Sequence, residues 1–233
     1  MPAAFPQFKG NETERLHQCI DFVNKTIQLK RLNAKDLLFF AMFSPAEILQ
    51  RKKAYAGFPC LDLSLVAAET LIQNGIPSKL VIERRHAEKI MEVHHYFLEL
   101  QIEGKPMHIA IGRGLHLAEG LVSSMRKVRM HGVKGEKIEG EAQRKMEINY
   151  SSSHANEPAY QVLGFHSRKY LRHFLNWTLP HAARVLLKYN STASIRRIAE
   201  GNNKEVVSEM PKFPIGKRIM RVIMKPFRRR RRS

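Results

Sequence analysis

The chain is poor in cysteine and has no long hydrophobic run, and each shortage narrows the class of protein. Only two cysteines occur, Cys19 and Cys60. The N-terminal segment MPAAFPQFKG has neither the charged start nor the apolar stretch of a secretory signal. No apolar stretch approaches the roughly 18–20 residues that a membrane-spanning helix needs. We therefore expect a cytoplasmic protein with free thiols.

Acidic residues are also scarce relative to basic ones. The 233 residues include 40 Lys and Arg against 21 Asp and Glu, which gives a formal net charge of +19. The excess is uneven, because residues 212–233 contain ten basic residues and no acid. This charge predicts an anionic partner, which is nucleic acid, an acidic lipid surface or an acidic protein. The later histidines, His154, His166, His173 and His181, lack the close pairing of a zinc site, and we expect neither a metal nor another cofactor.

Hydrophobic patterning predicts an α+β domain. The apolar content of 43% is enough for a folded core. Helices are expected after the capping signals at Asn11 and Ser44, and a helix over 60–74 is apolar on nearly all sides, which predicts a central position. Strands are expected over 78–85, 94–104 and 106–114. The predicted architecture is an antiparallel sheet packed on the helix that carries Cys60.

Composition divides the chain into three parts. Residues 10–118 hold the predicted core. Residues 119–211 begin with a charged, glycine-containing stretch, 126–145, which predicts a mobile loop or a hairpin. Short helices are expected over parts of 167–200, so this second part is a basic loop with a helical extension. Residues 212–233 form a polybasic amphipathic tail.

Cys60 and two adjacent histidines, His94 and His95, are the candidate catalytic residues. Orphan backbone N–H groups and the helix dipole favour a thiolate at a helix N-terminus. A histidine on a neighbouring strand can then act as its base. The alternatives are a buried thiol that serves as a small hydrophobic residue, and histidines that only lie at a strand surface. Cys19, on the apolar face of its helix, is expected to be a core residue.

These residues resemble the transglutaminase-like superfamily, which includes arylamine N-acetyltransferases. Three motifs carry the resemblance: Gly57-Phe58-Pro59-Cys60, Gly75-Ile76-Pro77 and His95-Tyr96-Phe97-Leu98-Glu99-Leu100. The family pattern places the base at His95 and leaves His94 as a structural histidine. The resemblance covers roughly residues 44–114. It implies attack of the Cys60 thiolate on an amide, ester or thioester carbonyl of a protein, peptide or small acyl substrate.

One member of the family's Cys-His-Asp triad is missing. Ala110 stands where the resemblance places the aspartate. The chain contains only three aspartates, and all precede the histidines: Asp21, Asp36 and Asp62. The site would then work as a Cys-His dyad, or a helper would orient the base, and the candidate helpers are His94, Glu99 and His108. The other outcome is an inactive site, because loss of the orienting carboxylate lowers turnover by about 10⁴ in a serine enzyme.

The basic tail suits two kinds of anionic partner. An amphipathic segment over 213–227 would lie on an acidic bilayer, where each basic residue contributes about 1 kcal/mol. The same cations would contact nucleic-acid phosphates without sequence specificity, or would only keep the chain soluble. The residues assigned to an anionic surface are Lys217, Arg218, Arg221, Lys225, Arg228, Arg229, Arg230, Arg231 and Arg232.

Two functional hypotheses follow. The first is cysteine-dependent acyl transfer or amide hydrolysis by Cys60 and His95. The second is a catalytically inactive transglutaminase-like module that docks on an anionic surface through its tail, at the periphery of a membrane or on nucleic acid.

Overall fold

The computed structural model describes residues 4–30, 41–55, 59–87, 90–112, 114–131 and 137–166, with single positions at 169, 172 and 176. The chain divides into two compact units, residues 1–32 with 39–165 and residues 33–38 with 166–233. All the elements named below belong to the first unit. The helices predicted within 167–200 and the basic tail lie, apart from the single positions, outside the described residues.

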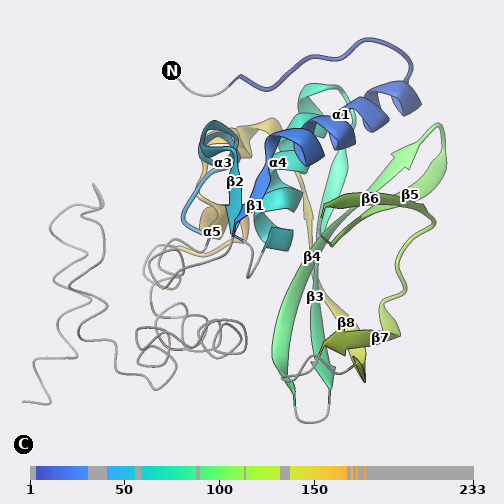
Figure 1. The fold of residues 1–233 in the computed structure, drawn as a ribbon, viewed down its shortest axis with the longest axis vertical. Helices are drawn as coiled ribbons and strands as arrows, with labels where there is room; N and C mark the ends of the chain where they lie inside the picture. Colours follow the sequence, from blue (N-terminus) through green and yellow to red (C-terminus); the bar gives the residue numbers. More distant parts are fainter. Residues whose placement is uncertain are drawn as a thin grey trace, which may run out of the picture. The chain divides into compact units, whose positions relative to one another are not determined.

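The described part of the first unit is mixed α+β, with a few helices and a curled antiparallel sheet (Figure 1). The helices are α1 (Glu12–Thr26), α3 (Pro45–Arg51), α4 (Pro59–Gln73), the 3-10 helix η1 (Ser152–Asn156) and α5 (Ala159–Val162). The strands are β1 (Gln28–Lys30), β2 (Lys53–Tyr55), β3 (Ser78–Ala87), β4 (Ile90–Ile102), β5 (Lys105–Ile111), β6 (Leu115–Glu119), β7 (Met125–His131) and β8 (Lys137–Asn149). The predicted α+β class is confirmed.

Local capping signals set the starts of α1 and α3. The Asn11 side chain accepts a hydrogen bond from the Glu14 backbone N–H at 2.8 Å, and the Glu14 carboxylate accepts one from the Asn11 N–H at 2.9 Å. Ser44 and Glu47 form the same reciprocal pair at α3, at 3.3 and 2.9 Å. Both starts were predicted from sequence, because a capping box depends only on residues three apart.

Helix α4 is the buried centre of the unit. Every residue from Cys60 to Leu71 is buried, as its all-round apolar sequence predicts. The helix ends in a left-handed turn at Gly75 (φ +72°), where the Ile76 N–H donates to the Leu71 carbonyl at 3.0 Å. A helix fixed at its end and buried on all sides holds its first turn, with Cys60, in one place.

The main sheet has the strand order β6-β5-β4-β3-β8-β7, and each neighbouring pair is antiparallel. Strands β3, β4 and β5 match the three strands predicted from sequence. The stretch 126–145 supplies β7 and much of β8, so the hairpin alternative is confirmed. Because β8 pairs with β3 along its length, this stretch belongs to the same sheet as the Cys60 region.

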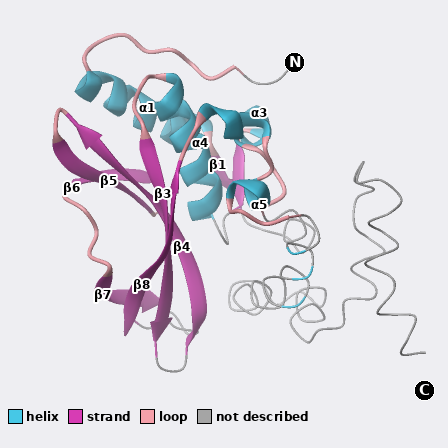
Figure 2. Cartoon of the chain, turned by 180° about the vertical axis from the view of Figure 1, so that it is seen from behind, coloured by secondary structure: helices cyan, strands magenta, loops and turns pink. Residues whose placement is uncertain are grey.

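The helices α1 and α4 lie against one side of this sheet (Figure 2). The Cys60 thiol is close enough to the Tyr96 hydroxyl of β4 to raise its pKa, so Tyr96 faces α4. Side chains alternate along a strand, and His95, Phe97 and Glu99 therefore belong to the opposite face. Because of this alternation, the His95 side chain lies among the residues of the sheet face that points away from α4.

Candidate functional site

Cys60 lies in the first turn of α4, with 9% of its surface exposed. The backbone N–H groups of Tyr96 and Leu61 lie close enough to the thiol sulfur to favour its ionised form. Burial raises the pKa of Cys60 to about 11, and these N–H groups together with the Arg85 charge offset only part of that rise. The thiol is therefore protonated at neutral pH, although it occupies a position that would favour a thiolate.

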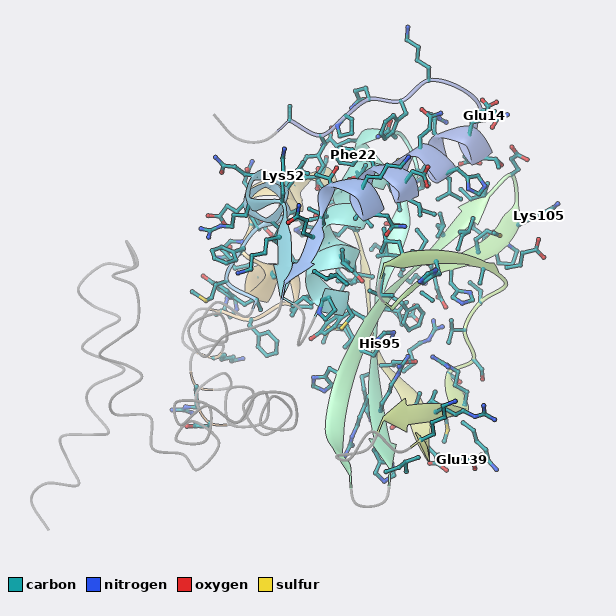
Figure 3. The ribbon with its side chains drawn as sticks, in the orientation of Figure 1. Glu14, Phe22, Lys52, His95, Lys105 and Glu139 are labelled. Carbon is teal, nitrogen blue, oxygen red and sulfur yellow. The ribbon has the colours of Figure 1, made fainter. Side chains whose placement is uncertain are left out.

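His95 lies on β4, between the helices and strands β7 and β8 (Figure 3). Its ring stacks on Phe97, with 6.3 Å between ring centroids. Burial, together with the positive charges of Arg85 and Arg126, lowers the pKa of His95 to about 3. The imidazole is therefore neutral across the physiological range, and its surroundings oppose the uptake of a proton.

Cys60 and His95 are neighbours through the backbone. The backbone N–H of Tyr96, the residue after His95, lies close to the sulfur, and the Arg85 charge lowers the pKa of both the thiol and the imidazole. Within the described part of the chain, no hydrogen bond joins the Cys60 sulfur to the His95 ring. The structure thus brings the two residues to one region as a neutral thiol and a neutral imidazole.

Two buried carboxylates share the face of His95, and both are paired with arginines. Glu83 lies directly across from His95 in the β3–β4 register. Its Oε1 accepts from Arg85 Nε at 2.5 Å, and both of its oxygens accept from Arg126 Nη2, at 3.0 and 3.2 Å. Two guanidinium groups therefore surround the carboxylate that is best placed to orient the imidazole.

Glu99, the predicted acidic helper, is engaged in the same way. Its two oxygens accept from Arg144 at 2.5 and 3.0 Å, and its Oε1 also accepts from the Val122 N–H at 3.1 Å. Arg144 in turn donates to the Val122 carbonyl at 2.6 Å. This buried pair ties β8 and the segment before β7 to the centre of the sheet, and no hydrogen bond in the described residues connects it to His95.

The remaining candidate helpers also have other surroundings. His108 Nδ1 lies 2.8 Å from the Gly120 carbonyl oxygen. His94 alternates onto the α4 face of β4, where its side chain is exposed. Ala110 is paired with His116 across β5 and β6, and in the described residues no carboxylate forms a hydrogen bond with the His95 ring.

Arg85, Arg126 and Arg144 are the site residues that sequence reasoning missed. Arg126 and Arg144 reach the site because β3, β7 and β8 pair in one sheet. This pairing brings Arg126 to Glu83, 43 residues away in the sequence. It also brings Arg144 to Glu99, 45 residues away. The alternation Glu83-Arg84-Arg85 in a predicted strand is the one local signal, because residues two apart share a face.

The basic charge of the chain is concentrated in residues 167–233, which contain 18 Lys and Arg against three acids. Residues 1–166 contain 22 Lys and Arg against 18 Asp and Glu, a net charge of only +4. The nine tail residues assigned to an anionic surface lie outside the described residues. Their charge of +9, however, is more than twice the net charge of residues 1–166.

No protein-family model matches the chain, and comparisons with curated proteins and with solved structures gave no match. The resemblance to transglutaminase-like proteins therefore stays a prediction from three motifs. In the described residues, no helix is long and apolar enough to cross a membrane. The same residues contain no group of three or more His, Cys, Asp and Glu side chains placed to hold a metal.

Proposed function

We propose that this chain is a transglutaminase-like binding module with a catalytically silent Cys-His site, and that it docks on an anionic surface through its basic C-terminal residues. The proposal of a catalytically silent site rests on one observation, the set of charges around His95. A triad histidine needs a carboxylate against its ring, whereas His95 lies beside Arg85 and Arg126. The proposed fold is a transglutaminase-like core followed by a helical extension.

The size of the effect supports a silent site. Acyl transfer requires the thiol proton to move to the imidazole before or during attack. Because the pKa of Cys60 is raised to about 11 and the pKa of His95 is lowered to about 3, the neutral thiol and imidazole are strongly favoured over the thiolate–imidazolium pair. Catalysis would have to form that disfavoured pair before any bond to carbon forms.

The proposal that the chain docks on an anionic surface rests on the distribution of charge along the sequence. A nearly balanced core followed by 67 residues with a net charge of +15 resembles a folded module with an attached polycation. Such a segment is attracted to acidic bilayers, at about 1 kcal/mol per basic residue near the surface. It also binds nucleic-acid phosphates, with an affinity that falls steeply with salt.

The binding test compares the full chain with a variant in which the five arginines Arg228 to Arg232 are changed to glutamine. A matched control changes five lysines of the core that the structure places at the surface: Lys9, Lys25, Lys52, Lys105 and Lys127. We expect the tail variant to lose most sedimentation with phosphatidylserine vesicles, or most binding to a random duplex, and the control to retain both. Equal loss in the control would move the binding surface to the core.

A second candidate function is cysteine-dependent acyl transfer or amide hydrolysis by Cys60 and His95. It is favoured by one observation, the pair of backbone N–H groups that converge on a thiol at the start of a buried helix. Such donors stabilise a thiolate or an oxyanion. In this alternative, one of His94, Glu99 and His108 becomes the helper after rearrangement, and Cys60 reacts rapidly with alkylating agents at neutral pH.

A further inference from the structure

A second buried polar cluster lies farther along α4, about two and a half turns beyond Cys60. Glu69 has no exposed surface, and its Oε1 accepts a hydrogen bond from Gln73 Nε2 at 2.8 Å. Its other oxygen, Oε2, has no hydrogen-bond partner among the described residues. The hydroxyl of Tyr150, a residue that is 4% exposed, has no partner at full hydrogen-bond geometry in the described residues, but it interacts with the Glu69 carboxyl.

The Glu69 carboxyl and the Tyr150 hydroxyl face each other. Tyr150 follows directly after β8, and it perturbs the ionisation of Glu69 and is perturbed by it. Burial raises the pKa of Glu69, and the influences of Gln73, Tyr150 and His154 only partly oppose the rise. Burial and the nearby Glu69 likewise raise the pKa of Tyr150.

The geometry alone argues that Glu69 is a neutral acid. No Lys or Arg side chain in the described residues forms an ion pair with it, and a fully buried carboxylate without a cation is strongly disfavoured. The groups that act on it come from its own helix (Gln73), from the residue after β8 (Tyr150) and from η1 (His154). Glu157 acts one step away, since its Oε2 lies 2.8 Å from His154 Nδ1 and it also bears on Tyr150.

Tyr150 begins the last segment of the first unit, residues 150–163, which contains η1 and α5. Three backbone hydrogen bonds attach this segment to other parts of the unit. The Tyr150 N–H donates to the Ser78 carbonyl at 3.0 Å. The Ala159 N–H donates to the Phe43 carbonyl at 3.2 Å, and the Tyr160 N–H donates to the Ala41 carbonyl at 3.0 Å. Ala159, Val162 and Leu163 are buried. The segment therefore helps to cover α4, and the Glu69–Tyr150 cluster lies at its start.

We infer that Glu69 and Tyr150 form a pH-sensitive latch for residues 150–163. While Glu69 is protonated, the segment stays closed over α4. When Glu69 ionises, the open state is favoured, because only opening lets water reach the carboxylate. Since residue 166 begins the second unit, the latch controls the segment that continues into the basic part of the chain.

The direction of the pH effect follows from the raised pKa of the closed state. Below a pH of about 4.5, Glu69 is protonated in both states, and opening does not depend on pH. Above it, the open state loses its proton first, so the opening constant rises up to tenfold per pH unit. The rise ends once the pH passes the pKa of the closed state, where both states are ionised.

Amide hydrogen exchange, measured by NMR on the full chain from pH 5 to 8, tests the latch without any substitution. The amides of Tyr160 and Leu163, bonded to Ala41 O and Ala159 O, report on the segment. The amide of Gly120, bonded to Pro106 O, is the internal control. After correction for intrinsic base catalysis, we expect exchange at Tyr160 and Leu163 to rise up to tenfold per pH unit and exchange at Gly120 to stay level.

Variants then assign the effect to Glu69. Glu69→Gln should remove the additional pH dependence, while Glu139→Gln, a change at an exposed acid of β8, should leave it in place. Tyr150→Phe removes a group that lowers the pKa of Glu69, so the rise should continue to higher pH. The latch is refuted if Tyr160 and Gly120 show the same pH dependence in the wild-type chain, a result that needs no variant to fold. None of these outcomes depends on the proposed function.

Discussion

The reactivity of Cys60 separates the silent module from the enzyme. At pH 7, a thiol with a pKa of about 11 is about 10⁻⁴ ionised, while an ordinary thiol with a pKa of about 8.5 is about 3% ionised. We therefore expect Cys60 to react with iodoacetamide about 300-fold more slowly in the folded protein than in the denatured chain, because only the thiolate is nucleophilic. The rate should rise about tenfold per pH unit from pH 6 to 10.

The measurement is peptide mass spectrometry of alkylated Cys60, with Cys19 as a second buried thiol in the same chain. His95→Ala should leave the rate nearly unchanged, and so should the control His108→Ala, whose ring nitrogen contacts the Gly120 carbonyl. A rate at pH 7 that exceeds the rate of the denatured chain, is flat between pH 7 and 9 and falls in His95→Ala would refute this reasoning. That result would favour the acyl-transfer alternative in its place.

Three further predictions concern stability and binding. Arg144→Met leaves the carboxylate of Glu99, which is 4% exposed, without its cation, and should lower the free energy of unfolding by about 3–5 kcal/mol in urea denaturation. Most of this loss should be recovered when Glu99→Leu is added. A loss below about 1 kcal/mol would show that the ion pair does not stabilise the sheet. Ser44→Ala removes the cap of α3 and should cost about 1 kcal/mol, whereas Ser123→Ala, in an exposed loop, should cost far less; equal losses would contradict the capping role. If the five arginines Arg228 to Arg232 contact duplex phosphates, changing them to glutamine should reduce the slope of log K against log salt by about 4–5, and an unchanged slope would place the contact elsewhere.

The sequence predicted those parts of the fold that depend on near neighbours in the chain. The boxes at Asn11 and Ser44 need residues three apart, and the apolar surround of 60–74 is a property of one helix. The alternation of Tyr96 and Leu98 with Phe97 and Glu99 marked β4 as a strand. These signals also placed Cys60 at a helix start and His95 on the adjacent strand.

The sequence could not predict the charges around His95. Alternation showed that His95 and Glu99 share a face, but it could not show that Arg144 reaches the carboxylate from β8. That contact depends on the order in which β3, β8 and β7 pair, and the charged stretch 126–145 looked equally like a loop. The cross-strand register places Glu83 opposite His95. Arg85 and Arg126 lie near His95 because both form ion pairs with Glu83.

The pH titration of His95 by NMR of its imidazole tests the silent site most directly. We expect the ring to stay neutral from pH 5 to 8, consistent with a pKa of about 3, and we expect Arg126→Gln to raise that pKa by removing one of the two cations. A midpoint at or above 6.5 that shifts when Cys60 is alkylated would show a coupled thiol–imidazole pair and would contradict a silent site.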